Sequence, residues 1–233
     1  MHNRTQTSKY NAYQFGTCTP LSEMQMNQLI GFFNQPPLQA SSVLGGRDSV
    51  TCHQIKEMGS VAVKHYKRGG FTGRFIRRRY LRCGKTRSQT EFELLLKAQD
   101  LGISVPQPLV SASRGLLFYR AWLVTREIKQ PQSLARLSLI DEGRARNAMQ
   151  SVIEQISRLV DHGILHVDLH PGNVVVDKKD HVFLIDFDKG RIWRGSRAKL
   201  KDRYIKRWQR AVAKHKLPPM LSEILQAGLK DIG

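Results

Sequence analysis

A short run of polar residues in the second half of the chain has the spacing needed for phosphoryl transfer. His166-Val167-Asp168 is followed, five residues after the aspartate, by Asn173, which gives the pattern H-x-D-x-x-x-x-N. Transfer of a phosphoryl group needs a carboxylate that orients and deprotonates the attacking hydroxyl, and oxygen ligands for Mg²⁺ on the phosphates. We therefore interpret Asp168 as the catalytic base and Asn173 as a magnesium ligand.

A second aspartate, Asp186, follows an apolar run and lies eighteen residues after Asp168. This spacing leaves room for one hairpin, and an aspartate at the end of a short strand can bind the metal from its other side. The alternatives are that Asp168 and Asn173 only stabilise turns, or that Asp168 and its neighbouring histidines bind a transition metal. The hydrophobic-Asp-Phe-Asp element favours the kinase-type site, with His166 as a structural brace.

The same chemistry needs a strand lysine for the ATP phosphates and a helix carboxylate that positions it. Val61-Ala62-Val63-Lys64 has the V-A-x-K form of such a strand, although a solvent-facing strand lysine would read the same way. The carboxylate is Glu91 or Glu93; we favour Glu91, which opens a predicted helix, over a role limited to the helix dipole. Gly45-Gly46 lies where a turn over the ATP phosphates belongs, but G-x-G-x-x-G is absent and an ordinary β-turn is the alternative.

The composition describes a globular chain with a strong positive charge. The chain has 233 residues, of which 40% are hydrophobic, and 38 Lys+Arg against 19 Asp+Glu give a net charge of +19. This composition rules out wholesale disorder, and no apolar run approaches the roughly 18–20 residues that span a bilayer. The N-terminus lacks the apolar stretch of a secretory signal, and the three separated cysteines indicate neither a disulfide framework nor a zinc site. We expect a protein of the reducing cytosol.

The excess charge lies in two segments. Residues 58–90 hold ten basic residues and no acidic one, and residues 189–216 hold twelve basic residues and a single acid, Asp202. Localised charge of this kind indicates a binding face. The candidates in the first segment for binding phosphates or carboxylates of an acceptor are Arg77, Arg78, Arg79 and Arg87.

The tail over residues 193–217 mixes basic and aromatic residues. Such a composition is typical of a helix on an anionic membrane, where each cation contributes on the order of 1 kcal/mol. The other interpretation is a helix that packs its aromatic side chains inward and leaves a charged face in water, and the two can hold together. Only 45 residues follow Asp188, without an A-P-E signal, so we expect a small or lipid-linked acceptor rather than a peptide.

The elements that must position these residues change in character along the chain. Strand-like runs around one helix at residues 91–98 give way to mostly helical patterns, including an amphipathic helix at residues 145–160. We predict an α+β chain in two lobes, with a β-rich N-lobe and a short, mostly helical C-lobe. The predicted divisions are an N-terminal extension over 1–38, an N-lobe over 39–127, and a C-lobe with a basic helical tail over 128–233. Within the extension, residues 1–20 are expected to lack regular structure, and Ser22 to cap a helix over 23–33.

Several of these segments together resemble the lipopolysaccharide kinase family of Gram-negative bacteria, over about residues 42–195. The most specific strings are H-Y-K-R-G-G at 65–70 and D-F-D-K-G-R at 186–191, which ordinary protein kinases lack. The other matching segments are Gly45-Gly46-Arg47, Lys85-Thr86-Arg87, Glu91–Leu95, Val105–Pro108 and His166–Asn173. Pro171-Gly172 inside the loop is nearer to aminoglycoside-type phosphotransferases.

The resemblance implies an α+β, protein-kinase-like two-lobed fold. It also implies phosphorylation of a sugar hydroxyl, of Kdo (3-deoxy-D-manno-octulosonic acid) or heptose, in the lipopolysaccharide inner core, with ATP and Mg²⁺ as cofactors. It implies a lipid A-linked acceptor and peripheral attachment to the cytoplasmic side of the inner membrane. The implied roles are ATP binding for Lys64 with its partner Glu91, base catalysis for Asp168, and Mg²⁺ binding for Asn173 and Asp186.

Two other functions are left open by the residues. One is a minimal atypical serine/threonine protein kinase of the RIO type, which would use the same site on a protein hydroxyl. The other is a non-catalytic basic protein that binds nucleic acid. A nucleic-acid binder has no need of Lys64, Asp168, Asn173 and Asp186 together, so we do not expect nucleic acid as a partner.

Overall fold

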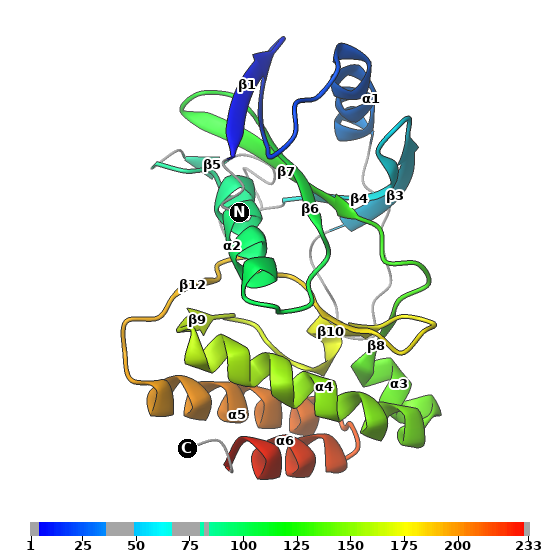
Figure 1. The fold of residues 1–233 in the computed structure, drawn as a ribbon, viewed down its shortest axis with the longest axis vertical. Coiled ribbons are helices and arrows are strands. Elements are labelled where there is room, and N and C mark those ends of the chain that lie inside the picture. Colours follow the sequence, from blue (N-terminus) through cyan, green and yellow to red (C-terminus); the bar gives the residue numbers. More distant parts are fainter. Residues whose placement is uncertain (1–4, 36–48, 67–79, 82–83, 231–233) are drawn as a thin grey trace. The chain divides into compact units, whose positions relative to one another are not determined.

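The computed structural model describes residues 5–35, 49–66, 80–81 and 84–230. It divides into two compact units, the first formed by Met1–Leu96 with Gln107–Glu127 and the second by Lys97–Pro106 with Ile128–Gly233. One unit is rich in strands and the other is mostly helical, which is the predicted α+β, two-lobed, kinase-like fold class (Figure 1). Each unit is described by itself below.

The first unit is built on an antiparallel sheet with the strand order β1-β2-β6-β7-β4-β3, to which β5 adds by pairing with β7. Its strands are β1 (Gln6–Tyr10), β2 (Tyr13–Thr17), β3 (Ser49–Ile55), β4 (Gly59–His65), β5 (Tyr80–Leu81), β6 (Pro108–Arg114) and β7 (Phe118–Arg126). Its helices are α1 (Glu23–Asn34) and most of α2 (Arg87–Asp100). Helix α1 confirms the helix predicted from Ser22, whose side chain forms a capping box with Gln25.

The prediction that residues 1–20 lack regular structure was wrong. Strands β1 and β2 form a hairpin that continues the sheet beyond β6, with Phe15 of β2 opposite Ala112 and fully buried. Asn11 in the hairpin turn has φ of 53°, a conformation that asparagine adopts more readily than most residues. In β2, Tyr13 and Phe15 are separated by one residue, so both aromatic rings lie on the same face of the strand and are buried there.

The two faces of the sheet have different roles. One face and α1 enclose an apolar core whose members include Phe15, Phe33, Val61, Val63 and Trp122. Successive side chains of a strand point to opposite faces of the sheet. Because Val61 and Val63 of β4 are buried on this face, Ala62 and Lys64 lie on the other face. The α1 side of the sheet therefore serves stability, and the opposite side of β4 carries the lysine of the predicted site.

The second unit contains short strands and a set of packed helices. Its strands are β8 (Gln132–Ser133), β9 (Ile164–Leu165), β10 (Val174–Val176), β11 (Val182–Leu184) and β12 (Arg191–Ile192). Its helices are α3 (Leu134–Ile140), α4 (Glu142–Asp161), a 3-10 turn (Pro171–Asn173), α5 (Arg197–Lys214) and α6 (Met220–Lys230). Strands β11, β10 and β8 form one small sheet and β12 and β9 another, while α4, α5 and α6 pack on one another (Figure 1).

Residues 97–106 belong to the second unit, whereas our division of the sequence placed them in the first lobe. The reason is a set of hydrogen bonds to Ser104: its carbonyl accepts from the N–H of Leu184 at 2.9 Å, and its N–H donates to Gln155 at 3.1 Å. Arg158 of α4 also donates to the carbonyl of Gly102 at 2.5 Å. The segment after α2 is thus held by α4 and by the end of β11.

Helix α5 packs its aromatic side chains inward. Tyr204 and Trp208 are 2% and 0% exposed, and Trp208 Nε1 donates to the carbonyl of Leu221 in α6 at 3.0 Å. This is the inward packing expected for the aromatic residues of the basic tail, and it keeps these two rings out of contact with a membrane. Across the described ranges, no helix combines the length and the apolar character needed to cross a membrane.

Candidate active site

The first unit brings Lys64 and Glu91 together in a buried ion pair. Lys64 Nζ lies 3.1 Å and 3.0 Å from the two carboxylate oxygens of Glu91, and the side chains are 12% and 3% exposed. The hydroxyl of Tyr66 donates a further short hydrogen bond to Glu91 Oε2. A carboxylate that accepts several charge-assisted bonds in a buried place has a fixed position, and it fixes the ammonium group of the lysine in turn.

The structure shows which of the two candidate carboxylates, Glu91 or Glu93, pairs with Lys64. Helix α2 begins at Arg87, and the hydroxyl of Thr86 accepts from the N–H of Gln89 at 3.3 Å, so Glu91 lies one turn inside the helix and does not open it. Glu93 is partly exposed and pairs with Lys85 at 2.6 Å. Glu91 is therefore the partner of Lys64, and its burial excludes a role limited to the exposed start of the helix.

Tyr66 is a member of this cluster that the sequence reasoning did not assign. Two cations lie over its ring, with Lys64 Nζ at 5.1 Å and Arg87 Cζ at 5.4 Å from the ring centroid. The N–H of Arg87 donates to the hydroxyl of Tyr119 at 3.1 Å. The sequence held one indication of this role: Tyr66 follows Lys64 by two residues, which places both side chains on one face of an extended chain.

Other predicted residues of the first lobe cannot be placed. Gly45, Gly46, Arg77, Arg78 and Arg79 lie outside the described residues. Of the proposed acceptor-binding arginines, Arg87 is the one that the structure describes, and it lies beside Tyr66 at the start of α2.

In the second unit the predicted catalytic loop is held by its own hydrogen bonds. Asn173 Nδ2 donates to the carbonyl of Asp168 at 2.9 Å, and the N–H of Ile185 donates to the carbonyl of Asn173 at 3.0 Å. His166 is 1% exposed; its Nε2 lies 2.9 Å from the carbonyl of Ile185, and its ring packs on Phe187 at 4.5 Å. His166 therefore acts as the predicted brace, joining the loop that carries Asp168 to the segment around Ile185.

Asp186 adopts an unusual backbone conformation next to this brace. Its φ is 64°, in the left-handed region, which aspartate occupies more readily than most residues other than glycine. Here the preceding residue is bonded to Asn173 and the following residue, Phe187, packs on His166, so the turn at Asp186 is set from both sides.

The donor chemistry of the second unit fits magnesium. Because the amide nitrogen of Asn173 is used by the carbonyl of Asp168, the amide oxygen is the atom that remains for a metal. Mg²⁺ prefers oxygen ligands and is commonly held by one or two protein groups together with substrate phosphates. In the ranges that the structure describes, no group of three or more His, Cys, Asp or Glu residues that could hold a metal ion is found.

His170 is a structural residue of the loop. Its Nδ1 accepts a hydrogen bond from the N–H of Gly172 at 3.0 Å, which caps the 3-10 turn. Burial lowers the pKa of His170 to about 4, with Arg207 adding to the effect and Asp168 opposing it. The ring is therefore neutral near pH 7, and since Nδ1 is an acceptor, its proton is on Nε2.

A residue far along the chain also contacts the predicted base. Arg207 Nη2 of α5 donates a short hydrogen bond to Asp168 Oδ1. Thirty-nine residues separate the two positions, and nothing in the sequence distinguishes Arg207 from the other basic residues of the tail.

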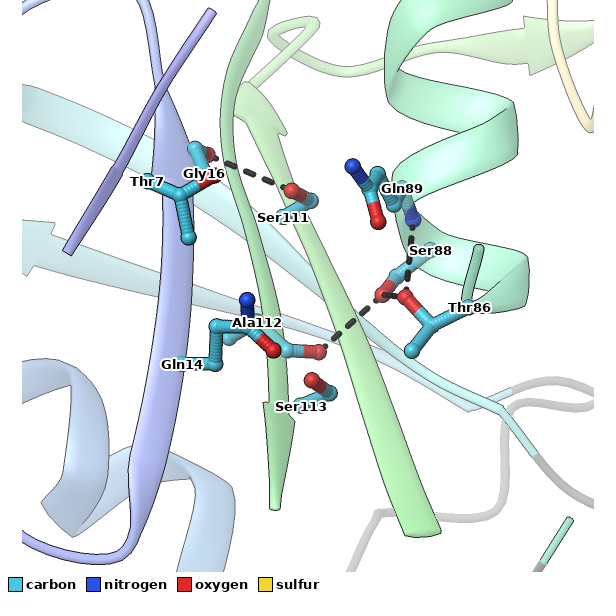
Figure 2. A pocket seen from close by; sticks show the side chains of 9 residues that line it. All are labelled: Thr7, Gln14, Gly16, Thr86, Ser88, Gln89, Ser111, Ala112 and Ser113. Atoms are coloured by element: carbon cyan, nitrogen blue, oxygen red, sulfur yellow. Dashed lines mark hydrogen bonds between the residues drawn. The ribbon is translucent and has the colours of Figure 1, made fainter. Parts of the chain in front are cut away.

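A small polar hollow in the first unit has none of the predicted site residues in its lining. It is lined by hydroxyl and amide groups of β1, β2, β6 and the start of α2 (Figure 2). Ser88 Oγ donates to the carbonyl of Ala112 at 3.0 Å, and Ser111 Oγ donates to the carbonyl of Gly16 at 3.3 Å. These bonds join α2 and β2 to β6, so the hollow belongs to the packing of the N-terminal hairpin.

Comparison with known proteins agrees with the resemblance seen in the sequence. The sequence model of the lipopolysaccharide kinase (Kdo/WaaP) family matches residues 41–222. A 3-deoxy-D-manno-octulosonic acid kinase of Vibrio parahaemolyticus is 35% identical over 150 residues, which are 63% of this chain and 62% of that protein. Kinases with the same name are 33% identical in Vibrio cholerae, over 65% of this chain and 66% of that protein, and 31% identical in Xylella fastidiosa, over 73% and 68%.

The matched region covers only part of these relatives. The chain spans about three fifths of the length of the Vibrio parahaemolyticus protein, at 62%. The family match, however, extends over most of this chain and includes Lys64, Glu91, Asp168, Asn173 and Asp186. The chain therefore belongs to the lipopolysaccharide kinase (Kdo/WaaP) family.

Proposed function

We propose that the protein is a kinase that transfers the γ-phosphoryl group of ATP to a hydroxyl of Kdo in the lipopolysaccharide inner core. The observation that carries this proposal is the braced loop of Asp168 and Asn173 beside Asp186, in a chain of a lipopolysaccharide kinase family. The relatives named above are all called 3-deoxy-D-manno-octulosonic acid kinases, which favours Kdo over heptose as the acceptor.

Asp168 is the proposed base. The acceptor hydroxyl oxygen forms the new bond to the γ-phosphorus while the bond from that phosphorus to the β,γ-bridging oxygen breaks, and ADP leaves. The hydroxyl proton passes to the carboxylate of Asp168, which is half exposed and thus open to an acceptor. Lys64, held by Glu91, supports the ATP phosphates through its fixed ammonium group.

Asn173 and Asp186 are the proposed magnesium ligands. Mg²⁺ neutralises charge on the phosphates of the nucleotide and helps to orient them for transfer. The amide oxygen of Asn173 is oriented by the bond of its nitrogen to the carbonyl of Asp168, and the backbone on either side of Asp186 is held by Asn173 and His166. Both proposed ligands therefore lie in segments that contacts within this unit hold in place.

The charge of the chain suits an acidic, lipid-linked acceptor. We propose that the protein works as a peripheral protein on the cytoplasmic side of the inner membrane, on a lipid A-linked sugar. The supporting observation is the excess of basic residues over 58–90 and 189–216, which includes the candidate acceptor ligands Arg77, Arg78, Arg79 and Arg87. Anionic lipids and acidic sugars both attract such segments.

The test is phosphate transfer from labelled ATP with four separate acceptors. These are lipid A bearing Kdo, a heptose-containing core, a casein-like protein and nucleic acid. We expect Mg²⁺-dependent labelling of the Kdo lipid alone, with one added phosphate on the Kdo fragment in the mass spectrum.

Variants of the proposed site residues test the mechanism directly. Asp168→Asn and Lys64→Met should lose activity at least 10³-fold, since each removes a group that the transfer needs. Asp202→Asn is the matched control, because it changes an exposed aspartate that pairs with Lys206. Labelling of heptose or of casein instead of Kdo would refute the acceptor, and full activity of Asp168→Asn would refute the mechanism.

A further inference from the structure

We propose that Arg207 of α5 is a positioning residue for the base Asp168, an inference that rests on the proposed function. Its guanidinium donates to Asp168 Oδ1, while Oδ2 lies 3.9 Å from Nε2 of His170, too far for a hydrogen bond. In the described part of the chain the two oxygens thus have different neighbours. Arg207 fixes one oxygen and directs Oδ2 toward the acceptor hydroxyl.

The base needs such a partner because of where it lies. Asp168 is 49% exposed and lies on a loop, so its side chain would otherwise sample several rotamers in water. Transfer requires the base within hydrogen-bond reach of the attacking hydroxyl, and a misplacement of about 1 Å can cost on the order of 10²-fold in rate. A planar guanidinium holds a carboxylate oxygen in a defined direction.

The position of Arg207 is itself fixed by the packing of α5. The hydroxyl of Tyr204, one turn earlier, donates to the carbonyl of Ile164 at 2.6 Å and accepts from the N–H of His166 at 2.8 Å. Trp208, the next residue, is fully buried and bonded to α6. Helix α5 is therefore tied to the backbone that leads into Asp168, and Arg207 reaches the carboxylate from a rigid support.

Stability alone does not explain this ion pair. Arg207 is 33% exposed and its partner is half exposed, and pairs of that kind contribute only about 0–1 kcal/mol to folding. Removing the arginine should leave the fold intact, so that its effect on the reaction can be measured separately.

The first experiment compares Arg207→Ala with Arg210→Ala, an exposed arginine of the same helix. In Arg207→Ala we expect kcat to fall about 10- to 100-fold, with the KM values for ATP and for the Kdo lipid unchanged within twofold. Added guanidinium ion at millimolar concentration should restore part of kcat in Arg207→Ala and have no effect on Arg210→Ala. A KM for the Kdo lipid raised more than tenfold at unchanged kcat would overturn the proposal, because Arg207 would then bind the acceptor directly.

The second experiment asks whether Arg207 acts through Asp168. Adding Arg207→Ala to Asp168→Asn should cause no further loss of rate, because the carboxylate it positions is already gone. A full additional loss in the double variant, or wild-type kcat in Arg207→Ala, refutes the positioning role. An inactive wild-type protein would instead refute the proposed function, and the two failures are thus distinguishable.

A second, independent observation concerns the tip of the hairpin between β6 and β7 in the first unit. Leu116, Leu117 and Phe118 are consecutive and are 84%, 65% and 45% exposed. Arg114 and Arg120, on either side of the tip, are exposed as well. The sequence has no acidic residue between Asp100 and Glu127.

We infer that this tip inserts into an anionic lipid bilayer, which deepens the membrane part of the proposed function. An apolar tip flanked by cations is the arrangement that gains both from burial among acyl chains and from anionic headgroups. A protein partner of ordinary surface charge would not complement the uniformly positive flanks. The tip is thus the apolar contact with the membrane, a role that the buried aromatic residues of α5 cannot have.

The test is co-sedimentation with vesicles of phosphatidylglycerol and phosphatidylethanolamine, compared with phosphatidylcholine alone. We expect Leu116→Ser/Leu117→Ser to weaken binding to the anionic vesicles at least tenfold. The matched control is Leu139→Ser/Ile140→Ser, which changes another exposed apolar pair, 54% and 65% exposed, at the end of α3. Equal binding of the Leu116/Leu117 variant and the wild type refutes the inserted tip while membrane attachment stands. Absence of wild-type binding refutes both.

Discussion

Removal of one hydroxyl group tests the buried cluster around Lys64. In Tyr66→Phe the aromatic ring is retained, and the lost interaction is the hydrogen bond that Tyr66 donates to Glu91 Oε2. Tyr66 and Glu91 are each 3% exposed, so water cannot replace the donor. A hydrogen bond to a charged group contributes about 1.5–3 kcal/mol. Lys64 continues to donate to both oxygens of Glu91, and we therefore expect the free energy of unfolding to fall by about 2 kcal/mol.

Urea denaturation with an unchanged m-value is the assay for this loss. The control is Tyr10→Phe, whose hydroxyl accepts from Asn27 Nδ2 at 3.0 Å in an exposed place, and it should change stability by less than about 0.5 kcal/mol. The same hydroxyl should matter less in a Glu91→Gln background, because a neutral acceptor binds it more weakly. If Tyr66→Phe unfolds at the wild-type urea concentration, the hydroxyl does not support Glu91 and the cluster is wrongly described.

Three further predictions concern other parts of the fold. Phe15→Ala should lower the free energy of unfolding by about 3–5 kcal/mol in urea titrations, because the ring is fully buried in the core between the sheet and α1; a loss below about 1 kcal/mol would contradict its place in the core. Tyr204→Phe should lower the free energy of unfolding by about 2–3 kcal/mol and lower kcat, since two backbone groups around the predicted catalytic loop lose a buried partner; wild-type stability would exclude that link. Burial lowers the pKa of His170 in the folded state to about 4. Between about pH 6.5 and pH 4 the unfolded state therefore binds a proton at His170 that the folded state does not, and the free energy of unfolding should fall as the pH falls through this range. His170→Asn, which keeps an acceptor for Gly172, should show a shallower dependence in urea titrations at each pH, and an identical slope would contradict the burial of the ring.

The parts of the site that the sequence predicted are those whose partners lie close along the chain. Asn173 follows Asp168 by five residues, and its amide bonds to the carbonyl of that aspartate. Asp186 comes after a single hairpin, β10–β11, which returns the chain to Asn173 through the N–H of Ile185. In such short segments the spacing of polar residues and the length of the turn largely determine which atoms meet, so the motif alone was sufficient.

The parts that the sequence could not predict depend on distant packing. The hairpin β1–β2 has few apolar residues, and its stability comes from pairing with β6, about a hundred residues later, which local composition does not encode. Arg207 is one of twelve basic residues between 189 and 216, and only the inward face of α5, set by Tyr204 and Trp208, directs it to Asp168. Long-range contacts of this type need the helix and sheet packing that only the structure supplies.

The positive charge that dominates the composition is divided among different roles. In each unit one cation is committed to a carboxylate of the predicted site, Lys64 to Glu91 and Arg207 to Asp168. A uniform coating of cations for nucleic acid would not require these cations to be partly buried and bonded to acidic groups. An enzyme that binds ATP and an acidic sugar does require such ion pairs, because unpaired carboxylates in its site would repel both substrates. Two cations thus have defined partners in the predicted site, and we propose that other basic residues of the chain attract an anionic surface.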